Sequence, residues 1–266
     1  MRQYRPQVVF HAAAYKHVPL METNPDEAVR VNVLGTRVMV ALAREYGTER
    51  FVLVSTDKAA NPSSVMGATK RVCELLVTAQ SRHSSPYYTA VRFGNVLGSR
   101  GSVMPTFWKQ IERGAPVTVT HPDMTRYFIG LSEAVSLVIQ AACMTQAGDL
   151  FVLKMGEQIR IADLAHRMIR TKGLRVGKEV GIEYVGVRPG EKLHEELWSE
   201  EEVVQPTAHS QILRVCSNAH PDASWIEAEI DELIRLAAEK HKEPILRKVV
   251  ELSGLKSTYK EELVDS

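Results

Sequence analysis

One sequence feature limits the possible folds of this chain more than any other: a short apolar run followed directly by several polar residues. Phe51–Val54 is apolar and bounded by polar residues, which predicts a strand buried on both faces of a parallel sheet. The run Ser55–Lys58 follows at its carboxyl end, where open α/β sheets bind ligands. Asn61 and Pro62 then turn the chain into a helical pattern whose first turns carry Lys70. This unit predicts an α/β fold with a site beside the strand.

The rest of the chain repeats the same alternation of strands and helices. Apolar runs predict further strands at 7–10, 87–93 and 150–153, and helical patterns lie at 25–46, 65–81, 132–144 and 161–171. Asn24 and Pro25 are typical of a helix start, and Gly47 of its end. We therefore expect a doubly wound parallel sheet of the Rossmann type over residues 1–175, with substrate-loop insertions near 95–130.

Near residue 173 the pattern changes. A short strand is predicted at 181–185, and a Pro-Gly turn then leads into a helix that ends near Trp198. The end, 222–262, is helical and charged, as expected of a solvated outer layer. We expect residues 176–266 to form a smaller α+β substrate domain with this helical layer.

Composition excludes several classes of function. The 266 residues are 44% hydrophobic and 24% charged, with a net charge of +1, so neither nucleic acid nor an anionic membrane is expected as a partner. Cys73, Cys143 and Cys216 are far apart and match no metal spacing, which indicates a reducing cytoplasm. The histidines also predict no metal site. No apolar run approaches the ~20 residues of a membrane span.

Asp57 and Lys58 are the candidate acid and base. To act so near neutral pH the carboxyl must be protonated and the amine neutral, against reference pKa values of about 3.9 and about 10.4. Burial shifts both pKa values in that direction, and Lys70 nearby would further lower the pKa of Lys58. An ion pair that keeps both groups charged is the alternative. The backbone must bend after Thr56 for both side chains to meet one sugar, because neighbours on a strand point to opposite faces.

Other polar or small residues each admit two interpretations. Ala12, Ala13 and Ala14 follow the first strand and either admit a flat group or pack under a helix. Asn32, within an apolar helix, is either a satisfied amide or orients a catalytic water or lysine.

The same holds further along the chain. The loop with Gly94, Gly98 and Gly101 either presents amides to an anion or only turns the chain. Arg126 either clamps a diphosphate or forms a surface salt bridge. The run Arg188–Lys192 is either a phosphate and ribose contact or a plain turn.

These motifs, in this order, resemble one family. Ser55-Thr56-Asp57-Lys58, then Asn61-Pro62 and Met66-Gly67-Ala68-Thr69-Lys70, is similar to the capsular polysaccharide biosynthesis group, the UDP-N-acetylglucosamine 4,6-dehydratases of the extended short-chain dehydrogenase/reductase family. The resemblance extends over about residues 8–197. It implies NAD-dependent 4,6-dehydration of UDP-N-acetylglucosamine to a 4-keto-6-deoxy sugar, with NAD in preference to NADP. It also implies a cytoplasmic homo-oligomer, although longer family members can be membrane-anchored.

The resemblance also assigns residues to roles. The catalytic residues it implies are Thr56, Asp57, Lys58, Met66 and Lys70. The residues it implies for NAD are Ala12, Ala13, Ala14, Asn32, Ser55 and Lys70. The residues it implies for the UDP-sugar are Lys16, Asn95, Arg126, Arg188 and Glu191.

Two departures from the family pattern qualify this assignment. Met66 holds the position of the usual tyrosine, and a thioether cannot act as a general base. No Gly-x-x-Gly-x-x-Gly turn occurs in the 266 residues, so the chain looks like a member without its first three strands, with an exposed strand edge at Val8–Phe10. A UDP-sugar 4-epimerase and a truncated, non-catalytic nucleotide-sugar-binding chain are therefore kept as alternatives.

Overall fold

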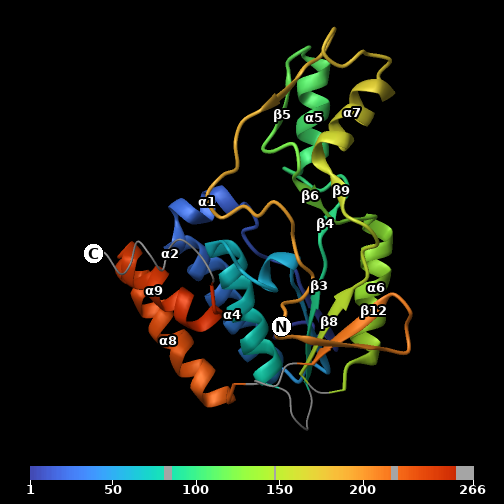
Figure 1. The fold of residues 1–266 in the computed structure, drawn as a ribbon. Coiled ribbons are helices and arrows are strands. Elements are labelled where there is room, and N and C mark those ends of the chain that lie inside the picture. Colours follow the sequence, from blue (N-terminus) through green and yellow to red (C-terminus); the bar gives the residue numbers. More distant parts are fainter. Residues whose placement is uncertain (81–85, 147, 217–220, 256–266) are drawn as a thin grey trace. The chain divides into compact units, whose positions relative to one another are not determined.

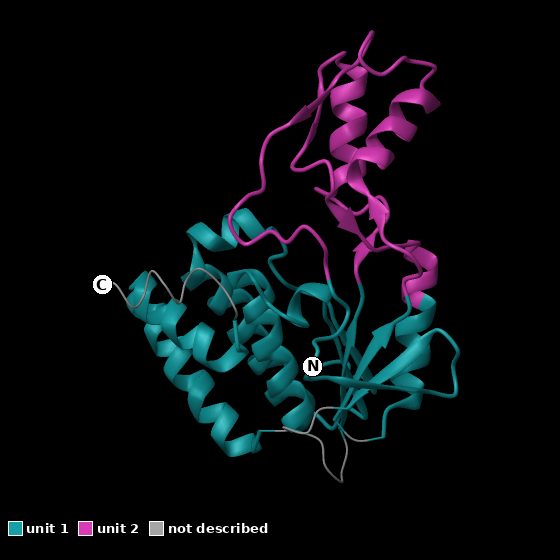
Figure 2. Ribbon diagram, viewed as in Figure 1, with its two compact units in different colours: residues 1–93, 136–154, 196–266 teal, residues 94–135, 155–195 magenta. Residues whose placement is uncertain are grey.

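The computed structural model describes residues 1–80, 86–146, 148–216 and 221–255. The chain divides into two compact units, with residues 1–93, 136–154 and 196–266 in unit 1 and residues 94–135 and 155–195 in unit 2 (Figure 2). This division differs from the predicted single boundary near 175. The chain passes from one unit to the other four times, and local composition carries no mark of those crossings.

Unit 1 is built on a six-stranded sheet in the order β1-β2-β3-β8-β12-β11. The parallel strands are β1 Val8–His11, β2 Arg50–Val54, β3 Tyr87–Arg92 and β8 Asp149–Leu153. The strands β12 Ile212–Cys216 and β11 Val203–Pro206 are antiparallel. The α/β, Rossmann-like fold class is thus confirmed. The β11–β12 hairpin was not predicted from the sequence.

Helices lie on both faces of this sheet (Figure 1). One face carries α4, α8 and α9, and the other carries the part of α6 that belongs to unit 1. The helical segments of this unit are α1 Val18–Thr23, α2 Pro25–Ala28, the π-helix η1 Val29–Leu34, α3 Gly35–Glu45, the 3-10 turn η2 Asp57–Ala59, α4 Val65–Ala79, α6 Leu131–Met144, α8 Ala223–Glu239 and α9 Lys242–Ser253. Among the described helices, none is long and apolar enough to cross a membrane.

The core of unit 1 explains why these helices form. The central strand β2 buries Phe51, Val52 and Leu53 completely, as its apolar run predicts. Helices α8 and α9 bury apolar stripes that include Ile230 and Val249 against the layer formed by η1 and α4. At the other end of the sheet β1 is an edge strand, with Val8 and Phe10 exposed as the sequence predicts.

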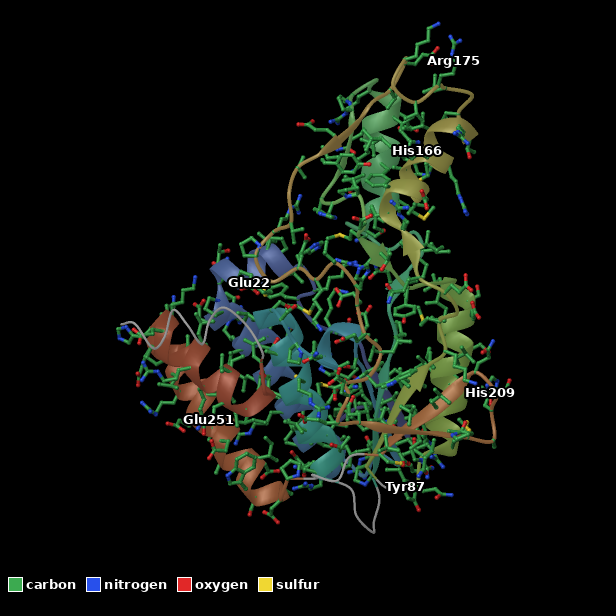
Figure 3. The ribbon with its side chains drawn as sticks, in the orientation of Figure 1. Glu22, Tyr87, His166, Arg175, His209 and Glu251 are labelled. Carbon is green, nitrogen blue, oxygen red and sulfur yellow. The ribbon has the colours of Figure 1, made fainter. Side chains whose placement is uncertain are left out.

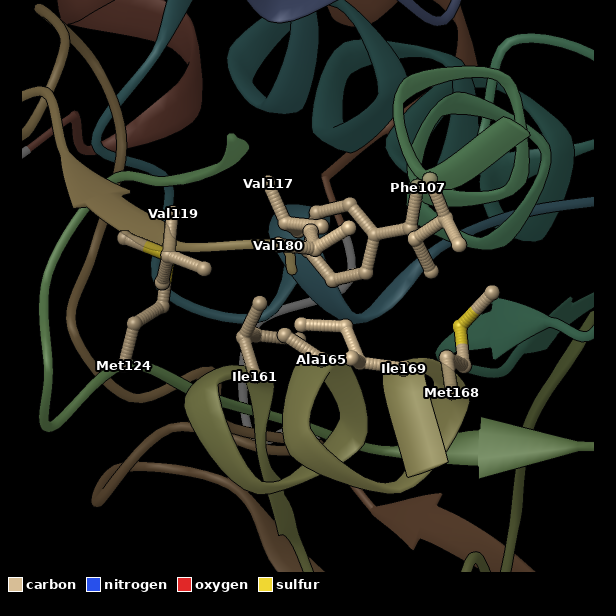
Figure 4. Close-up of a cluster of buried hydrophobic side chains, with 10 residues drawn as sticks. Phe107, Val117, Val119, Met124, Ile161, Ala165, Met168, Ile169 and Val180 are labelled. Carbon is tan, nitrogen blue, oxygen red and sulfur yellow. The ribbon is translucent and has the colours of Figure 1, made fainter. Parts of the chain in front are cut away.

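Unit 2 is a small α+β body with its own core. It contains β4 Asn95–Val96, α5 Val103–Glu112, β5 Val117–Val119, β6 Thr125–Arg126, β7 Phe128–Ile129, β9 Ile159–Arg160, α7 Ile161–Thr171 and β10 Ile182–Tyr184. Phe107 from α5 meets Ile169 from α7 and Val117 from β5 in a buried apolar cluster (Figure 4). Strand β10 pairs in parallel with β5, so the 182–184 segment joins unit 2.

Some sequence predictions of local structure were wrong. The helix expected to end near Trp198 does not form, because residues 186–198 are turns and bends after the Pro-Gly turn. The charged C-terminal helix divides at Lys240, whose positive φ of 59° ends α8. Its expected end at Glu262 lies outside the described residues.

We predict that Ile230→Ala lowers the free energy of unfolding by about 2–5 kcal/mol, because it leaves a cavity under a fully buried side chain of α8. Leu131→Ala, at a side chain that is 64% exposed, is the matched control and should cost about 0.5 kcal/mol or less. Chemical denaturation measures both changes. Equal costs would contradict the packing of α8 described above.

Candidate active site

The chain bends at the end of β2, at the position that the sequence requires. Thr56 is extended, with φ −145° and ψ 154°, and the 3-10 turn η2 begins at the next residue. Thr56 Oγ1 donates to Asp57 Oδ1 at 2.8 Å, and Lys58 Nζ approaches the same oxygen at 3.0 Å. Asp57 and Lys58 therefore meet as an ion pair, the alternative that the sequence left open. The carboxyl is 2% exposed, so the pair lies at the edge of the core.

The second carboxylate oxygen of Asp57 differs from the first. Asp57 Oδ2 is buried and has no hydrogen-bond partner among the described residues. The backbone is held firmly, since Asp57 N donates to Phe93 O at 3.1 Å and Ser55 N donates to Val91 O at 2.8 Å. The ladder between β2 and β3 thus continues up to the acid. It fixes the backbone of the residue that carries this buried oxygen.

Lys70 lies on α4 and reaches back to β2. Its Nζ donates to Val54 O at 2.8 Å, just before the polar run. Burial lowers the pKa of Lys70, while Cys73 and Glu74 on the same helix oppose that shift. This amine is therefore biased towards its neutral form beside the end of β2.

Met66 lies one turn before Lys70 and is buried in an apolar cluster. Its neighbours there include Val18 and Met21 of α1 and Leu246 of α9. The thioether therefore belongs to a packed core that α9 completes. A proton-transfer role at this position is excluded by the chemistry of sulfur in a thioether.

The first turn of α4 is held closely against η2. Ser64 Oγ accepts from Gly67 N at 3.1 Å, and Glu22 Oε1 accepts from Val65 N at 2.7 Å. Glu22, labelled in Figure 3, is buried, and burial raises the pKa of its carboxyl. A Cβ on Gly67 would lie 2.3 Å from the backbone oxygen of Lys58. Only glycine permits this approach, so Gly67 helps to set the position of Lys58.

Asn32 is a clamp in this structure. Its Oδ1 accepts from Tyr15 N at 2.8 Å, and its Nδ2 donates to Tyr15 O and to Thr69 Oγ1, each at 3.1 Å. The side chain lies in the π-helix η1, a distortion that often marks functional sites. Every polar atom of the amide is engaged, which favours the satisfied-amide interpretation. The clamp ties the segment after β1 to α4.

The small residues after β1 are open to solvent. Ala12 and Ala13 are exposed and Ala14 is partly buried, so they do not simply pack under a helix. Lys16 is exposed as well. Ser55 is different, because it is buried and its Oγ donates to Glu74 Oε1 at 2.6 Å. Ala12 and Ala13 thus offer small, exposed side chains at the end of β1, whereas the Ser55 hydroxyl is directed to a buried carboxylate.

His11 precedes these alanines and is a buried, neutral imidazole. Thr36 Oγ1 donates to Asn32 O at 2.6 Å, so its hydroxyl proton is used there and His11 Nε2 donates to Thr36 Oγ1 at 3.1 Å. Burial, and secondarily the charge of Lys70, lowers the pKa of His11 to about 4. The neutral state of His11 was not predicted from the sequence, because burial of this side chain depends on the packing of distant segments.

Four of the residues predicted to bind the UDP-sugar gather in unit 2. Asn95, Arg126, Arg188 and Glu191 line one cavity of about 250 Å³, together with Ser102 at the start of α5. Ser102 Oγ and Glu191 Oε2 are buried and have no hydrogen-bond partner among the described residues. The cavity thus combines two guanidinium groups with unsatisfied polar atoms.

Arg126 is held by several contacts within unit 2. It is buried, and its Nη1 donates to Thr125 O at 2.7 Å and to Leu193 O at 3.2 Å. Its Nε lies 3.8 Å from Glu195 Oε1. These contacts lie within unit 2 and are buried, so Arg126 does not form the surface salt bridge that was the alternative. Among the described residues, no group of three or more His, Cys, Asp or Glu side chains is arranged to hold a metal ion.

Comparison with known proteins identifies the family of this chain. The family model described as "Polysaccharide biosynthesis protein" matches residues 1–217. The capsular polysaccharide biosynthesis protein CapD of Staphylococcus aureus is 52% identical over 215 residues, which are 80% of this chain and 36% of that protein. The probable polysaccharide biosynthesis protein EpsC of Bacillus subtilis is 55% identical over 203 residues, 76% of this chain and 34% of that protein.

The fold thus defines a Rossmann-like protein, and its relatives include proteins named as nucleotide-sugar epimerases. The chain belongs to the polysaccharide biosynthesis protein family. It spans about a third of the length of CapD and EpsC. A Rickettsia canadensis relative named UDP-glucose 4-epimerase is 41% identical over 74% of this chain and 57% of its own length. The solved structure of Pen from Bacillus thuringiensis matches with a TM-score of 0.72 and 37% identity, over 82% of this chain and 68% of that one.

We predict opposite effects for alanine at two helical glycines. Gly67→Ala should lower the free energy of unfolding by about 1–3 kcal/mol, because the new Cβ meets the rigid backbone of Lys58. Gly35→Ala is the control: its φ is −58° and nothing lies within 4 Å of an added Cβ. It should raise stability by roughly 0.5–1 kcal/mol. Urea denaturation measures both, and a neutral Gly67→Ala would disprove the close contact.

The buried, neutral His11 should make the folded state less stable in acid. The pKa of His11 is lowered from 6.5 to about 4 in the folded chain. Between these two pH values the unfolded chain therefore binds a proton at His11 and the folded chain does not. Stability should therefore fall as the pH drops from about 6.5 to about 4, by on the order of 3 kcal/mol from this group. His11→Gln should flatten that part of the stability profile, whereas His241→Gln at an exposed position should leave it unchanged. An identical profile in His11→Gln would show that another group controls it.

Proposed function

We propose that this chain carries the acid–base chemistry of an NAD-dependent 4,6-dehydration of UDP-N-acetylglucosamine in polysaccharide synthesis. The observation that supports this most is the buried Asp57–Lys58 pair at the end of β2, with one carboxylate oxygen unsatisfied among the described residues. An acid and a base in contact suit an elimination, in which one group takes a proton while the other gives one. The resemblance of the surrounding motif to 4,6-dehydratases agrees with that chemistry.

The pair can reach its working protonation state internally. Transfer of one proton from Lys58 Nζ to Asp57 across the 3.0 Å contact gives a neutral amine and a carboxylic acid with no change in net charge. A site closed by the sugar favours this state, because burial disfavours the charged form of both groups. The ion pair in the structure is thus the resting form of the proposed acid and base.

Each side chain then has one proton to move. NAD, when bound, would supply the hydride chemistry of the reaction, in which C4 of the sugar is oxidised and C6 is later reduced. The 4-ketone acidifies C5, Lys58 removes the C5 proton, and Asp57 protonates the departing C6 hydroxyl, which leaves as water. Lys58 later returns a proton to C5. The proton released from the C4 hydroxyl balances the one given to the leaving group, so the pair is restored.

The C4 hydroxyl proton needs an acceptor other than Met66. Lys70, with its lowered pKa, is suited to this task in its neutral form, either directly or through a water held by Thr56. The amine is fixed by its bond to Val54 O, which places it beside the same strand end. In this proposal Lys70 supplies the base that a tyrosine supplies elsewhere in the family.

Unit 1 offers residues that suit the nicotinamide ring of NAD but none that we assign to its pyrophosphate. The exposed small side chains Ala12 and Ala13 at the end of β1 allow a flat ring to lie against the backbone. Asn32 supports this surface indirectly by clamping the backbone of Tyr15. The sequence contains no Gly-x-x-Gly-x-x-Gly turn for the pyrophosphate, so we assign no residue of this chain to that group.

The cavity in unit 2 suits the UDP portion of the substrate. Arg126 and Arg188 supply guanidinium groups for the diphosphate. The amides at the start of α5 favour a negative charge, as helix N-termini do. The unsatisfied Glu191 Oε2 can accept from a ribose hydroxyl. Asn95 completes the polar lining.

The alternatives remain distinct from this proposal. Relatives named UDP-glucose 4-epimerase favour epimerisation, but that chemistry has no use for the Asp57–Lys58 pair. A non-catalytic nucleotide-sugar-binding chain would use only the cavity of unit 2. The three proposals differ in product: a 4-keto-6-deoxy sugar, a C4 epimer, or bound substrate returned unchanged.

The test is incubation of the full chain with NAD and UDP-N-acetylglucosamine, followed by mass spectrometry and NMR of the product. We expect loss of water and a 4-keto-6-deoxy sugar, and Lys58→Ala should lower kcat by about 10²–10⁴-fold because the C5 base is lost. Lys109→Ala, exposed on α5, is the control and should retain turnover. A C4 epimer, binding without turnover, or an undiminished kcat in Lys58→Ala would each refute the proposal.

A further inference from the structure

A buried network of charges lies behind the candidate acid–base pair, and the reaction proposed above does not use it. The Arg92 side chain on β3 is completely buried. Its Nε and Nη2 donate to the two oxygens of Glu74 at 2.8 and 2.7 Å. Its Nη1 and Nη2 donate to the two oxygens of Glu202 at 2.7 and 2.9 Å. One guanidinium thus holds two carboxylates from distant parts of the chain.

Arg71 completes the network and balances its charge. Its Nη1 donates to Glu74 at 3.2 Å and to Glu202 at 3.0 Å. Two arginines therefore face two glutamates, and the network has no net charge. Burying such groups is costly unless all are paired, and removal of one charge leaves another uncompensated. An arrangement of this kind specifies how β3, α4 and the segment around Glu202 fit together.

The network reaches the candidate site through Glu74. Ser55 Oγ donates to Glu74 Oε1 at 2.6 Å. Lys70 lies four residues before Glu74 on the same face of α4 and donates to Val54 O at 2.8 Å. Helix α4 is thus tied to two consecutive residues at the end of β2. The first tie carries the lysine and the second depends on the charged network.

Lys70 faces few ionisable groups. The groups that act on it are Cys73 and Glu74 on its own helix, and Lys70 in turn acts on His11 of β1. Glu74 favours the protonated amine. The negative charge of Glu74 is offset by the positive charges of Arg92 and Arg71. Glu74 therefore stabilises the protonated amine of Lys70 less than an unpaired carboxylate would. Charge balance in the network and the protonation of Lys70 are therefore linked.

We propose that Arg71, Arg92 and Glu202 are positioning residues for the dehydration proposed above. They hold Glu74 in place and balance its charge, so that Lys70 stays in register with the end of β2 and has no uncompensated carboxylate beside it on α4. This inference rests on the proposed function for its catalytic meaning. The link between the network and Lys70 is a property of the folded chain and is testable without turnover.

The test uses two variants that change the network charge in opposite directions. Glu202→Gln adds net positive charge and should lower the pKa of Lys70, while Arg71→Gln adds net negative charge and should raise it. Each shift should be on the order of one pH unit or less, the size expected when one charge is added to a partly buried group of charges. NMR titration of the chain with ¹³Cε-labelled lysine measures it, with Lys70→Gln assigning the signal.

Turnover provides the second readout. If neutral Lys70 accepts the C4 proton, the acidic limb of the kcat profile should move to lower pH in Glu202→Gln and to higher pH in Arg71→Gln, with KM for the UDP-sugar unchanged. Arg235→Gln, which removes an exposed ion pair with Glu239 on α8, is the control and should shift neither readout. Circular dichroism confirms that each variant is folded.

Two results would overturn the inference. Folded variants whose Lys70 titrations coincide with that of the unmodified chain would show that the network does not act on the amine. Shifts in the same direction for both variants would show a general loosening instead of a charge effect. If the unmodified chain yields no dehydrated product, the proposed function fails, and the lysine titration still decides whether the network controls Lys70.

Discussion

The parallel pairing of β2 with β3 is the interaction on which the rest of the structure depends. Its ladder extends beyond the regular strands, through Ser55 N to Val91 O and Asp57 N to Phe93 O. The acid is therefore positioned by backbone hydrogen bonds before any side chain contributes. The completely buried apolar residues of β2 explain why this pairing is central, since both faces of the strand are covered by helices.

Helix α4 converts this strand end into a chemical site. Gly67 allows the helix to approach the backbone of Lys58, and Lys70 and Glu74 then tie successive turns to Val54 and Ser55. Each contact requires a particular residue type: no Cβ at the first, a long amine at the second and a carboxylate at the third. The site is thus a consequence of how closely one helix packs on one strand.

The two units hold different candidate groups. Unit 1 carries the Asp57–Lys58 ion pair and Lys70, while the cavity with Arg126 and Glu191 belongs to unit 2. Each unit has its own apolar core. Polar atoms that lack partners among the described residues occur in both, at Asp57 and at Glu191. Buried atoms of this kind are costly, which is consistent with groups kept for a ligand.

The sequence by itself determined the strand, turn and helix over residues 51–70, because local polarity and spacing predict such elements. The residues that line the cavity of unit 2 were named through the resemblance to a family, since their local chemistry alone left two interpretations open. Only the tertiary structure decided that Asp57 and Lys58 pair, that Ser55 faces Glu74, and that a hairpin near the C-terminus completes the sheet. It also decided the partners of Arg92, which lie 18 and 110 residues away. Periodicity records which face of an element is buried, whereas a contact between distant residues depends on the path of the whole chain.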